Sequence, residues 1–176
     1  MSQSVSYDEQ NWQVFVALDD GVAEVDARTG RVTRTIALGG IPTAAAIDRR
    51  TGHVFVTCFS AAHDAKGTVV MLDAATGMVL RTSAVGGAPS VLAVDEQSGR
   101  VFVLETDGGI HKFLSAFSSN LVSWPDDTLS VLSSSSGAVL RTVTTGGPHA
   151  MAIDPSRDRA FIANPNQGTV SVLRAS

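Results

Sequence analysis

The sequence predicts an all-β protein assembled from four copies of one four-stranded unit. Three observations support this: an aspartate recurs after a short strand, an apolar triplet follows it by six residues, and an alternating strand comes next. The aspartates are Asp8, Asp48, Asp95 and Asp154, spaced 40, 47 and 59 residues apart. Four antiparallel strands in a repeat of this length are the signature of a β-propeller blade.

Each apolar triplet predicts a strand that is buried on both faces. The triplets occupy 14–16, 54–56, 101–103 and 160–162. The alternating strands that follow cover 21–26, 67–73, 127–133 and 168–173. A more polar fourth strand with an Arg-Thr pair closes the first three units, and no stretch shows helical periodicity across the repeats.

Short turns join these strands, and their residues have a physical role. Asp or Ser is followed four residues later by Gly at 26–30, 48–52, 73–77, 95–99 and 133–137. The side-chain oxygen accepts a hydrogen bond from the backbone two residues on, and Gly adopts the positive φ that the turn requires. We therefore expect the recurring aspartates to cap turns and not to act in catalysis.

The predicted blades cover about 3–38, 43–85, 90–145 and 149–176 of a single domain that spans 1–176. The last unit ends after its third strand, so the chain holds about 3.75 blades, whereas rings have about 4–8. We expect a second chain to complete a ring of about eight blades, the alternative being a fragment of a longer protein. The dimer would cover the apolar faces of Val14, Phe15 and Val16 at one end and of Phe161, Ile162 and Val170 at the other.

The motifs also carry a resemblance. Val-Phe-Val at 54–56, Gly-Thr-Val-Val-Met-Leu-Asp-Ala-Ala-Thr-Gly-Met-Val-Leu-Arg-Thr at 67–82 and the Gly-Gly-x-Pro turn resemble the YVTN family of β-propeller repeats. The resemblance covers nearly the whole chain. That family includes surface-layer and periplasmic proteins and is similar to the propellers of some redox enzymes and lactonases. The resemblance implies an extracytoplasmic location in a prokaryote, although residues 1–7 are polar and predict no signal peptide.

Composition excludes several function classes. The net charge of −4 gives no basic surface for nucleic acid, and no apolar run has the length of a membrane span. The single cysteine, Cys58, allows no disulfide within the chain and ends a strand that should be buried. The sequence contains no zinc-protease, Cys-x-x-Cys, nucleophile-elbow or phosphate-loop motif.

Ligands of propellers usually lie at the mouth of the channel, where the connections between blades gather. The residue after the turn proline is Thr43, Ser90 and His149 in units two to four, and these side chains are expected to ring that mouth. A metal site formed by His63, His111 and His149 is the alternative, but the spacing is too loose for a motif. A solvated rim histidine is the simpler interpretation of His149.

Unit three carries about a dozen extra residues within 106–127, including Phe113, Phe117 and Trp124. A long aromatic loop is not needed to build a blade, and such residues are enriched at interfaces. The loop either binds a partner, or folds back to cover its own blade or plug the channel. The leading hypothesis is a non-enzymatic scaffold without a cofactor that binds a protein or ligand as a homodimer. The alternative is an enzyme or metal-binding propeller with its site at the channel mouth.

Overall fold

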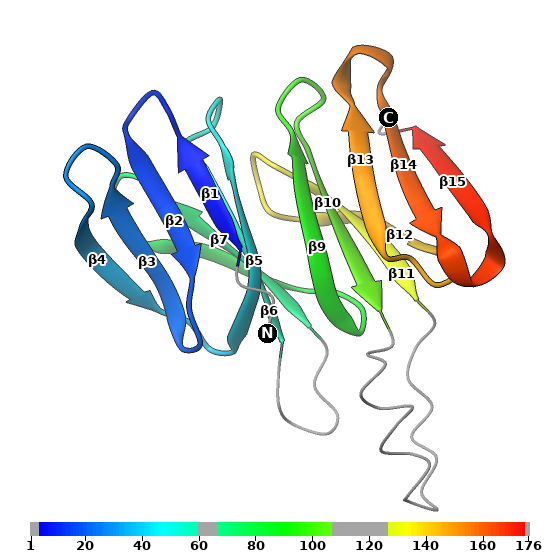
Figure 1. Cartoon of the computed structure of the whole chain (residues 1–176), viewed down its shortest axis with the longest axis horizontal. Helices are drawn as coiled ribbons and strands as arrows, with labels where there is room; N and C mark the ends of the chain where they lie inside the picture. The colour runs from blue at the N-terminus through cyan, green and yellow to red at the C-terminus, as the bar shows by residue number, and fades with distance from the viewer. Residues whose placement is uncertain (1–3, 60–66, 107–126, 175–176) are drawn as a thin grey trace, which may run out of the picture.

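The computed structural model describes residues 4–59, 67–106 and 127–174 and confirms the all-β prediction. Its strands form three four-stranded sheets and one three-stranded sheet, each a blade with antiparallel strands in chain order (Figure 1). Blade 1 contains β1 (Val5–Asp8), β2 (Gln13–Ala17), β3 (Gly21–Asp26) and β4 (Arg31–Ala37). Blade 2 contains β5 (Ile41–Asp48), β6 (His53–Phe59), β7 (Thr68–Asp73) and β8 (Val79–Ala84).

Blade 3 contains β9 (Ala88–Asp95), β10 (Arg100–Thr106), β11 (Thr128–Ser133) and β12 (Val139–Thr144). Blade 4 contains β13 (Ala150–Asp154), β14 (Arg159–Asn164) and β15 (Thr169–Arg174), joined by the 3-10 turns η1 (Pro155–Arg157) and η2 (Pro165–Gln167). The part of the chain that the structure describes holds no helix with the length and apolarity needed to cross a bilayer.

The recurring aspartates cap turns, as the sequence predicts. Asp48 Oδ1 accepts hydrogen bonds from the backbone nitrogens of Arg50 at 3.0 Å and Thr51 at 3.2 Å. Gly52 then takes φ +70°, a conformation that L side chains rarely adopt. These bonds fix the hairpin between the inner strand and the second strand of the blade, so the repeated aspartate is structural.

The four inner strands are β1, β5, β9 and β13, and consecutive ones pack on each other. Blade 1 and blade 4 lie at the two ends of this row, which forms an open arc (Figure 1). β15 has no fourth strand beside it among the described residues. The predicted arrangement of three complete blades and one three-stranded blade is therefore confirmed.

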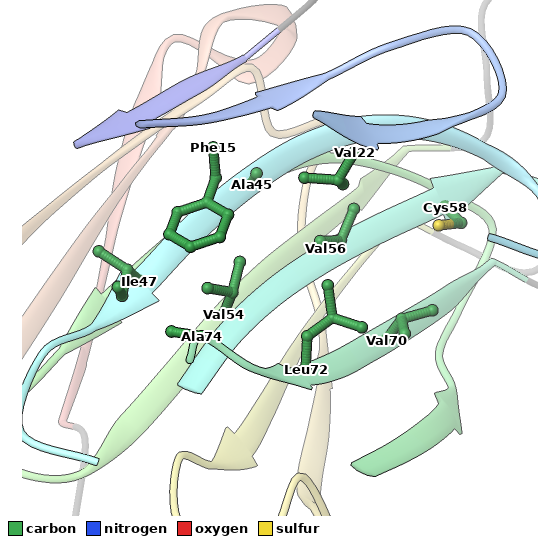
Figure 2. Packing of buried hydrophobic residues seen from close by; sticks show 10 residues of the cluster. All are labelled: Phe15, Val22, Ala45, Ile47, Val54, Val56, Cys58, Val70, Leu72 and Ala74. Carbon is green, nitrogen blue, oxygen red and sulfur yellow. The ribbon is translucent and has the colours of Figure 1, made fainter. Parts of the chain in front are cut away.

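Three apolar cores fill the three junctions between neighbouring blades. At the first junction Phe15 of blade 1 points toward Ala45 and Val54 of blade 2 (Figure 2). Phe55 of blade 2 occupies the equivalent place against blade 3, and Phe102 of blade 3 does so against blade 4. Blades 1, 2 and 3 thus present a phenylalanine to the next blade, which faces it with valines in blades 2 and 3 and with Ala160 and Ile162 in blade 4.

The prediction of strands buried on both faces is correct only for the two middle blades. In β6 and β10 every residue of the apolar triplet is buried. In β2 and β14 burial alternates, because no blade covers the outer side of blade 1 or blade 4. Phe15 and Ile162 therefore face inward, at 1% and 0% exposure, and the expectation that they belong to the uncovered faces is wrong.

The outward positions of the terminal blades are apolar. We call the outer side of blade 1 the N-terminal face; it carries Val5, Tyr7, Val14, Val16 and Val25. We call the outer side of blade 4 the C-terminal face; it carries Ala150, Ala152, Phe161, Val170 and Val172. Val5 is 63% exposed and Val170 is 62% exposed, so these faces present large side chains to solvent.

Candidate functional site

The inner strands of blades 2, 3 and 4 begin at the predicted channel mouth. Thr43 is the third residue of β5, Ser90 is the third residue of β9, and His149 directly precedes β13. β9 and β13 both start at the lower end of the view in Figure 1. The three predicted residues therefore occupy equivalent places in successive blades.

Thr43 takes part in holding two blades together. It is the extra residue of a β-bulge, because the pairing of β5 with β6 passes from Pro42 to Ala44. Its hydroxyl donates to the carbonyl oxygen of Pro89 in blade 3 at 2.7 Å and lies 2.8 Å from the Thr57 hydroxyl. The side chain is half-buried and bonded on two sides, which leaves it little capacity for a ligand.

Ser90 and His149 are the exposed members of this set. Ser90 is also the extra residue of a bulge, and its hydroxyl lies 3.5 Å from the carbonyl oxygen of Leu104. Nδ1 of His149 lies 3.3 Å from the carbonyl oxygen of Gly147, within its own turn. Among the residues that the structure describes, neither side chain has a strong polar partner, so both are candidates for contacts at the mouth end.

A buried acid, Glu105, lies at the same end of blade 3 and was not anticipated from the sequence. Its side chain is fully buried, and Oε2 accepts a hydrogen bond from the Thr128 hydroxyl at 2.5 Å. Burial raises the pKa of this carboxyl above its ordinary value of 4.5. The Gly86-Gly87 turn lies over this pair, and a β-carbon at Gly86 would clash with the Thr128 hydroxyl.

Blades 2, 3 and 4 carry different residues at the position of Glu105. Cys58 pairs with Thr68 in blade 2, Glu105 with Thr128 in blade 3, and Asn164 with Thr169 in blade 4. Burial raises the pKa of the Cys58 thiol to about 11, so the thiol stays protonated and unreactive at neutral pH. This agrees with the interpretation of Cys58 as a small buried residue. An alignment of the repeats could have shown that Glu105 occupies the position of Cys58 and Asn164. The residues next to Glu105 in the sequence do not predict that it is buried.

An open hollow of about 420 Å³ lies between blades 3 and 4. The chain from Thr144 to Gly147 forms one side, and Asp127, Asn166 and Gln167 line the rest. The lining is polar, with amide, hydroxyl and carboxylate groups that can hydrogen-bond to a ligand. The shape is shallow, which fits a surface contact better than an enclosed small-molecule site.

The metal alternative finds no support in the described part of the chain. Residues 4–59, 67–106 and 127–174 contain no group of three or more His, Cys, Asp or Glu side chains placed to hold a metal ion. Two of the predicted ligands, His63 and His111, lie outside the described residues. The predicted interaction loop with Phe113, Phe117 and Trp124 also lies outside them.

No protein-family model and no curated protein matches the sequence. Solved structures do match over nearly the whole chain. A chain of the mitotic checkpoint complex matches with a TM-score of 0.71 and 16% identity, over 97% of this chain and 49% of that one. The computationally designed Ika8 protein matches at 0.69 and 18%, over 97% and 45%. The Pan2 WD40 domain of Neurospora crassa matches at 0.65 and 14%, over 92% and 46%.

These likenesses confirm the fold class that the geometry defines: the chain is a β-propeller repeat protein. The identities are low, so the likeness concerns the fold alone. The chain spans about half the length of the propeller chains it matches, between 45% and 49% of each. That fraction agrees with the open arc of blades.

Proposed function

We propose that this chain is one half of a propeller ring, that a second copy completes the ring, and that the ring is a non-enzymatic scaffold for a protein partner. The observation that carries the proposal is the pair of uncovered apolar faces on blades 1 and 4. Monomeric proteins rarely expose contiguous apolar patches of this kind unless another surface covers them.

The three junctions inside the chain indicate what covers such faces. At each of them a phenylalanine of one blade meets aliphatic side chains of the next blade, which are valines at the first two junctions and Ala160 and Ile162 at the third. The C-terminal face offers Phe161 and Val172, and the N-terminal face offers Val14 and Val16. Two copies related by a two-fold axis would join these faces twice, in identical junctions.

The scaffold part of the proposal rests on the neighbours and on the exposed mouth end. Propellers of known structure similar to this chain include a WD40 domain and a chain of a checkpoint complex, and protein binding is the simplest role for a site without a catalytic constellation. We propose that the partner contacts Ser90, His149 and the loop with Phe113, Phe117 and Trp124. The motif resemblance to YVTN repeats agrees with such a role and with an extracytoplasmic location.

Light scattering after size exclusion tests the assembly. We expect a mass of about twice the 18.3 kDa of one chain, at concentrations in the micromolar range. Val172→Glu places a charge on the C-terminal face and should shift the protein to monomer. Val79→Glu is a matched control, because Val79 is 50% exposed and Val172 is 54% exposed, but Val79 lies on the outer strand of blade 2. A wild-type chain that stays monomeric would contradict the proposed ring.

Deleting residues 108–124 tests the partner surface. β10 and β11 pair from Arg100 with Ser133 to Glu105 with Thr128, on both sides of the insertion. A short glycine turn should therefore close the hairpin and leave blade 3 folded. The proposal expects an unchanged strand-rich circular dichroism spectrum and dimer mass, with loss of the proteins that the immobilised wild-type chain retains. Retention of the same proteins by the deletion variant would remove the loop from the partner surface.

A further inference from the structure

We infer that Trp12 of one copy and Ser156 of a second copy meet at the junction between chains and set how the two copies align. This inference rests on the proposed ring. It starts from the turns between the first and second strands of each blade. At the junction of blades 2 and 3 the second residue after the aspartate of one blade lies against the fourth residue after the aspartate of the next.

An interior junction shows how the two positions fit together. Arg50 of blade 2 reaches over blade 3, where Nε donates to the carbonyl oxygen of Glu96 at 3.0 Å and Nη2 to the hydroxyl of Ser134 at 3.4 Å. Its guanidinium lies in front of Gly99, where a β-carbon would come within 2.9 Å of Nη2. At this junction the arginine of blade 2 thus leaves no room for a side chain at the fourth position of blade 3.

Blade 1 has a large residue at the position of Gly99. Its fourth position is Trp12, at φ 58°, where blades 2 and 3 have Gly52 and Gly99. The place is equivalent, because the carbonyl oxygen of Trp12 accepts a hydrogen bond from Ala27 at 2.8 Å, as that of Gly52 does from Ala74 at 2.9 Å. Positive φ is unfavourable for a bulky side chain, so the tryptophan is held there against a backbone preference.

The indole belongs to the position that an arriving arginine faces at the junction of blades 2 and 3. The guanidinium carbon of Arg28 lies 4.9 Å from the centre of its ring, a cation–π contact within blade 1. Trp12 is still 42% exposed. A residue that reaches this place from another blade must therefore be short.

The last blade supplies a short residue. The second positions of blades 1 to 3 are Gln10, Arg50 and Gln97, and blade 4 has Ser156. Ser156 is exposed in the turn η1, where its hydroxyl donates to Asp154 Oδ1 at 2.5 Å. The fourth positions are Trp12, Gly52, Gly99 and Asp158. The two ends of the chain therefore carry its shortest second-position residue, Ser156, and its largest fourth-position residue, Trp12. The two turns also carry opposite exposed charges, since the Glu9 side chain is 69% and the Arg157 side chain is 70% exposed.

This complementarity favours a second copy as the occupant of both faces, since the large residue at one end has its short counterpart at the other end of the same chain.

Exchanging the sizes of the two residues tests this inference. Ser156→Arg should clash with Trp12 of the second copy and raise the dissociation constant of the dimer by about tenfold to a hundredfold. Adding Trp12→Gly should restore association, because the pair then repeats the Arg50 and Gly99 arrangement.

Ser135→Arg is the control, an exposed serine in a turn of blade 3 away from both terminal faces, and should leave the dissociation constant unchanged. Trp12 gives a second readout once Trp124→Phe has removed the other tryptophan of the chain. Its emission should shift to the blue as the protein concentration rises through the dissociation constant. Circular dichroism checks that each variant is folded.

The outcomes separate the two proposals. A dimer that tolerates Ser156→Arg, or that Trp12→Gly fails to rescue, would overturn the alignment by these two residues while leaving the ring intact. A Trp12 emission that stays constant across dimerisation would do the same. A wild-type chain that remains monomeric would overturn the ring and the alignment together.

Discussion

The phenylalanines at equivalent positions of the blades allow a matched test of what covers each face. Phe102 is fully buried between blades 3 and 4, and Phe161 is half-buried on the C-terminal face. Phe102→Ala removes a buried aromatic ring and should lower the free energy of unfolding by about 3–5 kcal/mol. That is a large part of the roughly 5–15 kcal/mol that stabilises a typical domain, and corresponds to a fall in melting temperature of about 6–20 °C.

Phe161→Ala makes the same chemical change where no blade packs on the outer side. In the monomer it should cost about 1 kcal/mol, because the ring is already partly in contact with water. In the dimer the cost should increase with protein concentration, since the ring then lies in the junction that association stabilises. Urea unfolding followed by circular dichroism, at a protein concentration below and another above the dissociation constant, measures both values. Equal losses for the two variants at low concentration would refute the assignment of the C-terminal face as uncovered.

Three further predictions concern the mouth end. Burial raises the pKa of Glu105 in the folded state, so the stabilisation by its protonated form is present below pH 4.5 and is lost as pH rises through the raised pKa. Glu105→Gln should therefore gain stability relative to the wild type between pH 4 and pH 8, as measured by urea titrations. Parallel curves of stability against pH for the two proteins would contradict this. Gly86→Ala should destabilise the protein by about 1–3 kcal/mol, since its β-carbon would clash with Thr128 and lie 3.2 Å from Glu105 Oε2, whereas Gly39→Ala has open space and should be nearly neutral in the same thermal melts. Metal analysis of the purified protein should show no stoichiometric metal, and a metal that is lost on His149→Ala would instead favour the metal-binding alternative.

The turns and strands follow from the sequence because their causes are local. Asp48 and Gly52 lie four residues apart, and their hydrogen bond and positive φ need only the turn itself. The bulges at Thr43 and Ser90 were not predicted, because a bulge depends on how two strands pair and not on the residues of one strand. As a result Thr43, which looks like a channel residue, bonds to the next blade at Pro89.

The burial of Glu105 was not predicted from the sequence for a related reason. In the sequence it ends an apolar strand, where a charged residue usually marks the solvent-exposed edge. Its burial depends on the Gly86-Gly87 turn that arrives from the previous blade and on Thr128 of the next strand. Contacts between blades depend on how the whole arc packs, so they cannot be predicted from the sequence of a single strand.

The outer faces of the terminal blades have the composition of covered surfaces. Repeat proteins whose ends face water carry terminal repeats with a polar outer face. In this chain the outward positions of β2 are Val14 and Val16, and that of β14 is Phe161, the same residue types that fill the interior junctions. The triplets of the two end blades were mistaken for strands buried on both faces because all their residues are apolar, as in the middle blades. A face with interior chemistry is expected where another blade covers it, and this expectation is the basis of our proposal that a second copy covers the two ends of the arc.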